Sequence, residues 1–155
     1  MLTILCLIYC AVGLSIKNTF NVSDSPIIDI ENDEDRIYFV AKNAVFDKAP
    51  LQYYTISTNQ TQSIPKTEGT NTIWNGNNLL LIGNGNQLIS IDKKTFQLDV
   101  KGTIASNDII NSISSVDTQI YGATASGKLC RWNLPNIMIF CNLVHAFNAT
   151  LVDAL

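Results

Sequence analysis

The sequence contains few of the residues that catalytic and metal centres use most. Its 155 residues include a single histidine, His145. A zinc site built on several histidines is therefore excluded, and a catalytic triad would have to depend on this one residue. We expect His145 to be a surface or half-buried side chain, and we expect a protein without enzymatic activity, cofactor or metal ion.

Two motifs that suggest ligand binding are incomplete. The acidic run 29–35 resembles the start of a calcium loop, but Glu34 stands at the position of the turn glycine and Val40 at that of the bidentate glutamate. The segment Gly83–Asn86 is unlike a phosphate-binding loop, because no Lys-Ser/Thr pair follows it and the next segment has a strand pattern. We expect both segments to be solvated connections between strands.

The chain also lacks an excess of positive charge. Ten Lys and Arg residues stand against 13 Asp and Glu residues, which gives a formal net charge of −3. Proteins that bind nucleic acids neutralise phosphates with clustered Lys and Arg. We therefore expect no nucleic-acid partner.

The one long apolar run is at the N-terminus. Residues 1–15 carry no charge, include the small residues Gly13 and Ser15 near their end, and are followed by Lys17. The run is shorter than the roughly 20 apolar residues that cross a bilayer, and its shape is typical of a secretory signal peptide. We expect a signal peptide over 1–15 and a secreted or ER-lumenal domain over 16–155, with no stable membrane span. The lack of Lys and Arg at its start leaves open a short membrane anchor or a buried N-terminal segment.

Cysteines and glycosylation sequons agree with a secreted chain. Cys6 and Cys10 fall within the predicted signal peptide, so Cys130 and Cys141 remain in the mature domain. Two cysteines in an oxidising compartment predict one disulfide, and the alternative is a pair of free buried thiols in a cytosolic protein. The sequons for N-glycosylation begin at Asn21, Asn59 and Asn148.

Turn residues recur at a constant spacing. Asn43, Gly85 and Gly127 each lie between two apolar segments, and both 85 minus 43 and 127 minus 85 equal 42. Asn and Gly tolerate the positive φ of tight hairpin turns, so the spacing has a structural reason. It indicates a repeated unit.

Each unit contains four short strand-like segments. These are 26–30, 36–40, 44–46 and 52–56 in the first unit (about 25–60); 70–74, 79–82, 87–92 and 96–100 in the second (about 70–102); and 109–113, 119–122, 128–132 and 137–141 in the third (about 109–143). Four antiparallel strands at a period near 40 residues are typical of β-propeller blades. We predict an all-β protein of about three four-stranded propeller-like blades, with a β-sandwich as the alternative. Closed propellers have four to eight blades, so three indicate a fragment, an open architecture, or a partial propeller that an oligomer or a partner completes.

The last hairpin carries the two cysteines. A two-residue loop at 135–136 places Leu134 opposite Ile137, so that the numbers of paired residues sum to 271. Cys130 and Cys141 then face each other with Cα atoms roughly 4.5 to 5.5 Å apart, a separation that suits a disulfide. A longer loop would shift the register and separate them.

Two segments resemble the sema domain of semaphorins and plexins. Residues 36–46, RIYFVAKNAVF, are similar to the strand pair that opens this domain, and residues 119–130, QIYGATASGKLC, are similar to a later segment. The resemblance implies an extracellular propeller that acts as a ligand or receptor in cell guidance through protein contacts.

Another segment resembles PQQ-like propellers. Residues 85–95, GNQLISIDKKT, are similar to the strand and turn of such a blade, and Phe96 stands where these blades usually have a glycine. Lumenal stress-sensor kinases carry blades of this type. This second resemblance implies a sensing or scaffold domain inside the secretory pathway.

These expectations favour a secreted, non-enzymatic protein-binding module, a sema-like ligand or receptor fragment in cell-cell signalling. The alternatives are a lumenal PQQ-like sensing or scaffold domain and an inert truncated product. Tyr53, Tyr54 and Trp74 are candidates for a protein-binding face, and core packing is the alternative for them.

Overall fold

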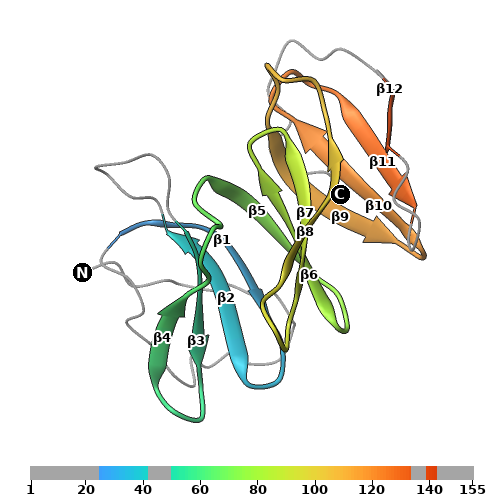
Figure 1. Cartoon of the computed structure of the whole chain (residues 1–155). Coiled ribbons are helices and arrows are strands. Elements are labelled where there is room, and N and C mark those ends of the chain that lie inside the picture. Colours follow the sequence, from blue (N-terminus) through green and yellow to red (C-terminus); the bar gives the residue numbers. More distant parts are fainter. Residues whose placement is uncertain (1–24, 42–49, 134–138, 143–155) are drawn as a thin grey trace, which may run out of the picture.

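The chain folds into three antiparallel β-sheets that follow one another along the sequence (Figure 1). The computed structural model describes residues 25–41, 50–133 and 139–142, and every regular element in these ranges is a strand. The first sheet consists of β1 (Ile27–Asn32), β2 (Arg36–Ala41), β3 (Leu51–Thr55) and β4 (Gln60–Ser63). The second consists of β5 (Thr70–Asn75), β6 (Leu79–Asn84), β7 (Gln87–Asp92) and β8 (Leu98–Thr103). The third consists of β9 (Ile110–Val116), β10 (Gln119–Thr124), β11 (Leu129–Asn133) and β12 (Ile139–Asn142).

Each sheet is an up-and-down meander in which the order of the strands follows the sequence. The first strands of the three sheets lie side by side, since β1 contacts β5 and β5 contacts β9. Four-stranded meanders arranged in this way are propeller blades, and we call them blades 1, 2 and 3. The predicted all-β architecture of about three propeller-like blades is therefore confirmed.

The assignment of strands within blade 1 differs from the prediction. The sequence predicts 52–56 as the fourth strand, but β3 is the third strand and pairs directly with β2, with Val40 opposite Leu51. The predicted third strand, 44–46, lies outside the described residues. The fourth strand is β4, in which all four side chains are exposed. No apolar alternation marks such a strand in the sequence.

A β-bulge recurs in the first strand of each blade. One extra residue interrupts the register at Ile28 in β1, at Asn71 in β5 and at Asn111 in β9. The spacings are 43 and 40 residues, from 71 minus 28 and 111 minus 71. A bulge bends its strand and increases the local twist, so the three blades change direction at equivalent points.

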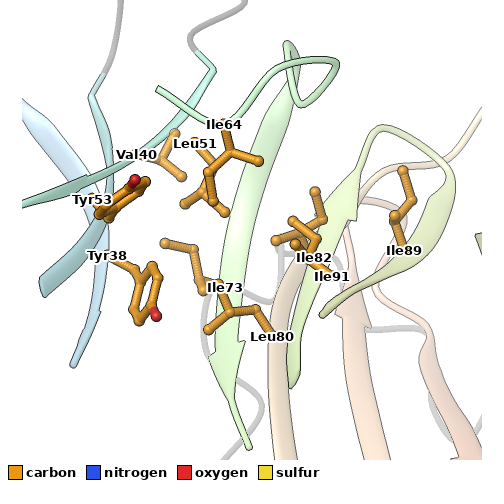
Figure 2. Packing of buried hydrophobic residues seen from close by; sticks show 10 residues of the cluster. All are labelled: Tyr38, Val40, Leu51, Tyr53, Ile64, Ile73, Leu80, Ile82, Ile89 and Ile91. Carbon is orange, nitrogen blue, oxygen red and sulfur yellow. The ribbon is translucent and has the colours of Figure 1, made fainter. Parts of the chain in front are cut away.

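Apolar side chains fill the spaces between neighbouring blades. The cluster between blades 1 and 2 consists of Tyr38, Val40, Leu51, Tyr53, Ile64, Ile73, Leu80, Ile82, Ile89 and Ile91, and Figure 2 shows side chains of both blades that point toward one another. The cluster between blades 2 and 3 consists of Leu81, Leu88, Ile104, Ile110, Ile113, Ile120, Cys130 and Trp132. Burial of one such large side chain stabilises the fold by about 1.5 to 3 kcal/mol.

Blade 2 is covered on both faces, which explains its continuous apolar sequence. Leu80 and Ile82 of β6 belong to the cluster with blade 1, whereas Leu81 between them belongs to the cluster with blade 3. Successive side chains of a strand point to opposite faces, so a strand between two blades needs apolar residues at every position.

The three aromatic residues considered for a binding face belong to the core. Tyr53 and Tyr54 are 8% and 7% exposed, and Trp74 packs against the cluster between blades 2 and 3. Core packing is the correct interpretation for these side chains.

The regularly spaced turn residues form hairpin turns in blades 2 and 3. Gly85 has a φ of +57° between β6 and β7, and Gly127 has a φ of +78° between β10 and β11. Asn43 lies outside the described residues. In the last hairpin, Cys130 lies directly opposite Cys141, which confirms the register expected from a sum of 271.

Gly122 in β10 provides a test of the packing between blades 2 and 3. A Cβ atom at this position would lie 2.6 Å from two ring carbons of Trp132, which is fully buried. We expect Gly122→Ala to lower the free energy of unfolding by about 1 to 3 kcal/mol, because a closely packed core has no room for the methyl group. Urea denaturation measures this loss.

The control is Gly85→Asn. A Cβ at Gly85 meets no atom within 4 Å, and asparagine tolerates a φ near +57°. We expect a loss below about 0.5 kcal/mol for this variant, as for most surface substitutions. Equal losses in the two variants would contradict the steric argument.

Candidate functional site

A groove of about 550 Å³ opens where turns of blades 1 and 2 meet. Three turns form it: the one between β1 and β2, the one between β5 and β6, and the one between β7 and β8. Its lining residues are Asp33, Glu34, Asp35, Arg36, Asn75, Gly76, Asn77 and Lys93. No single hairpin contains this set, so the groove depends on the packing of the two blades.

Asp33 organises the turn between β1 and β2. Its Oδ1 atom accepts hydrogen bonds from the backbone N–H groups of Asp35, at 3.3 Å, and Arg36, at 3.0 Å. Its Oδ2 atom accepts a hydrogen bond from the Tyr38 hydroxyl at 3.0 Å. An aspartate that binds backbone groups two and three residues ahead is a common way to fix a tight turn.

Lys93 joins this turn to blade 2. Its Nζ atom lies 3.5 Å from Asp33 Oδ2, and its side chain is 12% exposed. Burial opposes ionisation of Asp33, but the hydrogen bond from Tyr38, those from the backbone of Arg36 and Asp35, and the charge of Lys93 together lower the pKa of this carboxyl. Asp33 is therefore a stable anion at neutral pH.

Arg36 forms the second link between the blades. Its Nη1 atom donates a hydrogen bond of 2.9 Å to the carbonyl oxygen of Lys93. Its guanidinium lies 5.2 Å from the ring centre of Tyr53 in blade 1 and 5.4 Å from that of Phe96 in blade 2. The two rings stack with their centres 5.0 Å apart. Such cation–π contacts add about 0.5 to 2 kcal/mol to the apolar packing.

Phe96 adopts a backbone conformation that its side chain does not favour. Its φ is +55°, in the left-handed region that glycine adopts most readily. A large residue in this region loses roughly 1 to 2 kcal/mol. The stacking of its ring on Tyr53 offsets this loss. The contact between blades therefore stabilises a φ that this residue would not adopt by itself.

Asn75 lines the groove, and only one of its two side-chain polar atoms has a hydrogen-bond partner among the described residues. Its Nδ2 atom donates a hydrogen bond to the carbonyl oxygen of Asn32, at 2.5 Å. Its Oδ1 atom is buried and has no hydrogen-bond partner among the described residues. A buried acceptor without a partner is unfavourable by about 1 to 3 kcal/mol.

The rim of the groove is acidic. Glu34 and Asp35 are exposed, and the Asp35 carboxylate accepts hydrogen bonds from the backbone and hydroxyl of Ser57 at 3.0 and 2.9 Å. Lys93 neutralises Asp33, and the other charged lining residues, Glu34, Asp35 and Arg36, together carry a net charge of −1, with the two carboxylates the more exposed. The groove is therefore suited to a positively charged group.

A second groove of about 370 Å³ runs along the first strands of the blades. Asp29 of β1 connects the strands there, since its Oδ2 atom accepts hydrogen bonds from the Thr72 hydroxyl at 2.8 Å and the Ile73 N–H at 2.7 Å. Burial, and secondly the negative charge of Asp29, raise the pKa of Glu31 in this groove. The bond from Trp74 Nε1 to Ser115 Oγ, at 3.1 Å, plays the corresponding role between blades 2 and 3.

The residues predicted as site candidates are only partly described by the structure. Asn59 is exposed in the turn before β4, and its Oδ1 atom accepts a hydrogen bond from the Tyr54 hydroxyl at 2.7 Å. Asn21, Asn148, His145 and residues 1–15 lie outside the described residues. The acidic run 29–35 forms part of a strand and a turn, and no group of three metal-ligating side chains occurs in the described part of the chain.

The sequence gives no direct indication of the groove. Asp33 and Lys93 are 60 residues apart and meet only because blade 2 packs against blade 1. The one available signal is the repeat itself, since equivalent turns of successive blades lie at the same end of the molecule.

Comparison with known proteins identifies the fold and no family. No protein-family model matches the chain, and no curated protein matches it. Among solved structures, the computationally designed Ika4 protein is similar with a TM-score of 0.66 and 12% identity, over 86% of this chain and 81% of that one. The extracellular domain of the hybrid two component system BT4673 from B. thetaiotaomicron is similar with a TM-score of 0.65 and 16% identity, over 87% of this chain and 20% of that one.

The N-terminal domain of Nup159 is similar with a TM-score of 0.53 and 17% identity, over 85% of this chain and 33% of that one. A chain in a structure of S. cerevisiae Dbp5 bound to Nup159, Gle1, IP6 and ADP is similar with a TM-score of 0.54 and 17% identity, over 85% of this chain and 33% of that one. These neighbours are all-β, propeller-like folds, and this chain spans a minor part of the two natural ones. In the described residues, no helix is long and apolar enough to cross a membrane.

Substitutions of Phe96 test whether its ring stabilises the contact between blades by more than its left-handed φ destabilises the turn. Phe96→Ala loses the stacked ring and keeps the unfavourable φ, whereas Phe96→Gly loses the ring and removes the backbone strain. We expect both variants to be less stable than the parent protein, with the glycine variant more stable than the alanine variant by about 1 kcal/mol. Thermal and urea unfolding of the three proteins measure this order.

The order is the reverse of the usual one, in which alanine is more stabilising than glycine. An alanine variant as stable as the glycine variant would show that the left-handed turn relaxes when the ring is removed.

Proposed function

We propose that this chain is a non-enzymatic, protein-binding propeller module, and that it acts in the secretory pathway or outside the cell. The observation that carries the proposal is the groove between blades 1 and 2, with the exposed carboxylates of Glu34 and Asp35 on its rim. The fold supports it, because the similar structures include an extracellular domain and a propeller in complex with other proteins.

The partner supplies a basic segment to the groove. A Lys or Arg side chain would place its cationic group near Glu34 and Asp35. Charged hydrogen bonds are about twice as strong as neutral ones, and the opposite charges increase the rate of association.

Within this class of protein, we propose a sema-like ligand or receptor fragment that acts in cell-cell signalling. A second candidate is a PQQ-like sensing or scaffold domain in the ER lumen. The left-handed turn at Phe96 supports this second candidate, because PQQ-like blades usually place a glycine at the same point. The similarity to an extracellular domain of a two component system is in line with a sensing role.

The secretory proposal includes one disulfide and surface glycans. The register that places Cys130 opposite Cys141 supports the disulfide, because directly paired residues of antiparallel strands have Cα atoms at a separation that a disulfide spans. The exposure of Asn59 supports glycosylation at its sequon.

Selection from a phage-displayed random peptide library tests the groove. We expect selected peptides to be rich in Lys and Arg, to compete with one another, and to lose at least about tenfold in affinity against Glu34→Lys, since a repulsive contact replaces an attractive one. Fluorescence anisotropy of the labelled peptides measures this loss.

The matched control is Glu68→Lys, which makes the same charge change at an exposed site in the connection between β4 and β5. This variant should bind the peptides as the parent protein does. Selection of peptides without basic residues, or equal losses in the two variants, would exclude the groove as the binding site, and the absence of any binder would favour an inert product.

The secretory part is tested separately by intact-mass analysis of the protein secreted from a eukaryotic host. We expect a deglycosylated chain that begins at Ile16 and gains two thiol labels only after reduction. An unglycosylated chain retained in the cell, beginning at Met1 and labelled without reduction, would contradict secretion and the disulfide together.

A further inference from the structure

The sequence contains two Asn-Gly pairs, Asn75-Gly76 in the turn before β6 and Asn84-Gly85 at the end of β6. Such a pair can rearrange without an enzyme, because the backbone nitrogen of the glycine attacks the side-chain amide carbon of the asparagine. Glycine has no Cβ to hinder this approach. The attack requires a glycine N–H that is free of hydrogen bonds and a turn with room to move, and the two pairs differ in both respects.

The pair at the turn between β6 and β7 is open. Asn84 ends β6 and pairs with Gln87, which leaves a two-residue loop. Gly85, the first residue of this loop, has the positive φ that tight hairpin turns require there. Among the described residues, the Gly85 N–H donates no hydrogen bond, and a Cβ at Gly85 would meet no atom within 4 Å. The Asn84 side chain is partly exposed, and its Nδ2 atom donates an exposed hydrogen bond to the carbonyl oxygen of Glu68 at 3.0 Å.

The pair before β6 is closed. The Gly76 N–H donates a hydrogen bond of 2.9 Å to the carbonyl oxygen of Leu79, and a Cβ at Gly76 would lie 2.7 Å from the ring of Trp74. The Oδ1 atom of Asn75 is buried. An attack by the Gly76 nitrogen therefore has to break a backbone hydrogen bond and move the turn away from the indole ring first.

We propose that Asn84 is a site of spontaneous deamidation and that Asn75 is protected in the folded protein. The Gly85 nitrogen gives its proton to hydroxide and forms a bond to Cγ of Asn84. The bond between Cγ and Nδ2 breaks, and the amide nitrogen takes a proton from water and leaves as ammonia. Water then opens the cyclic imide at either of its carbonyl groups, which gives aspartate or isoaspartate at position 84.

The product weakens the contacts of this turn. A carboxylate at position 84 cannot donate to the Glu68 carbonyl oxygen and repels it, so the link to the connection between β4 and β5 is lost. Isoaspartate also lengthens the backbone next to a loop whose length fixes the register of β6 and β7. The Gly85 carbonyl oxygen accepts a hydrogen bond of 2.9 Å from the N–H of Ile110, the first residue of β9. Deamidation therefore weakens the contact between blades 2 and 3 as well.

Incubation of the folded full chain at physiological temperature and mildly alkaline pH, followed by peptide mapping, tests the proposal. Trypsin cleaves after Lys66 and Lys93 and nowhere between them, so both asparagines lie in one peptide and fragment ions measure them together. We expect Asn84 to react at least about tenfold faster than Asn75, because the reaction at Asn75 requires local opening of the turn. The reacted protein, separated by ion exchange, should unfold at a lower urea concentration than the parent protein.

The same incubation of the chain unfolded in guanidinium chloride is the control. Both pairs are then accessible, and we expect rates within about twofold of each other. In the folded protein, Gly85→Asn fits the positive φ and should slow the reaction at Asn84 at least about tenfold, because its Cβ hinders the attack.

Equal rates at Asn84 and Asn75 in the folded protein, or a faster reaction at Asn75, would overturn the proposal. An Asn84 that reacts only in the unfolded chain would overturn it as well. Peptide binding by the groove does not depend on this outcome, because the groove includes the turn before β6 and Asn84 lies at the other end of this strand.

Discussion

The structure depends on the contact between neighbouring blades. A four-stranded meander of this length has an apolar face that it cannot cover alone, and isolated small sheets are marginally stable in water. Blade 2 covers one face of each neighbour, with Leu80 and Ile82 on one side and Leu81 on the other. The same packing brings Asp33 of blade 1 to Lys93 of blade 2 and so creates the groove. Stability and the candidate site therefore have the same physical origin.

The contact between blades also sets the backbone conformation of Phe96, against the local preference of a large side chain. Phe96 keeps a left-handed backbone because its ring stacks on Tyr53 and lies beside Arg36. A glycine would satisfy the turn and leave the blade boundary without an aromatic contact. The phenylalanine at this position therefore favours the contact between blades over the conformation of the turn.

The sequence predicts blades 2 and 3 well because glycine residues mark their hairpin turns. Gly85 and Gly127 mark turns that need a positive φ, and the apolar segments beside them are long enough to recognise. Blade 1 was harder to predict, because β4 exposes all its side chains and has no apolar period. The groove could not be predicted from local patterns, since its residues come from three turns that only packing brings together. The repeated bulges could not be predicted either, because one extra residue in a strand does not change the composition of the segment.

The position of β4 gives the sequon at Asn59 a physical meaning. β4 is the outer strand of blade 1, pairs only with β3, and carries uncharged Gln, Thr and Ser side chains. An outer strand of this kind offers its unpaired backbone groups to any extended chain in a crowded compartment. Asn59 directly precedes it, so a glycan attached there would extend over this edge and keep strands of other molecules from adding to the sheet. In that case the glycan would prevent aggregation at an edge whose own side chains carry no charge.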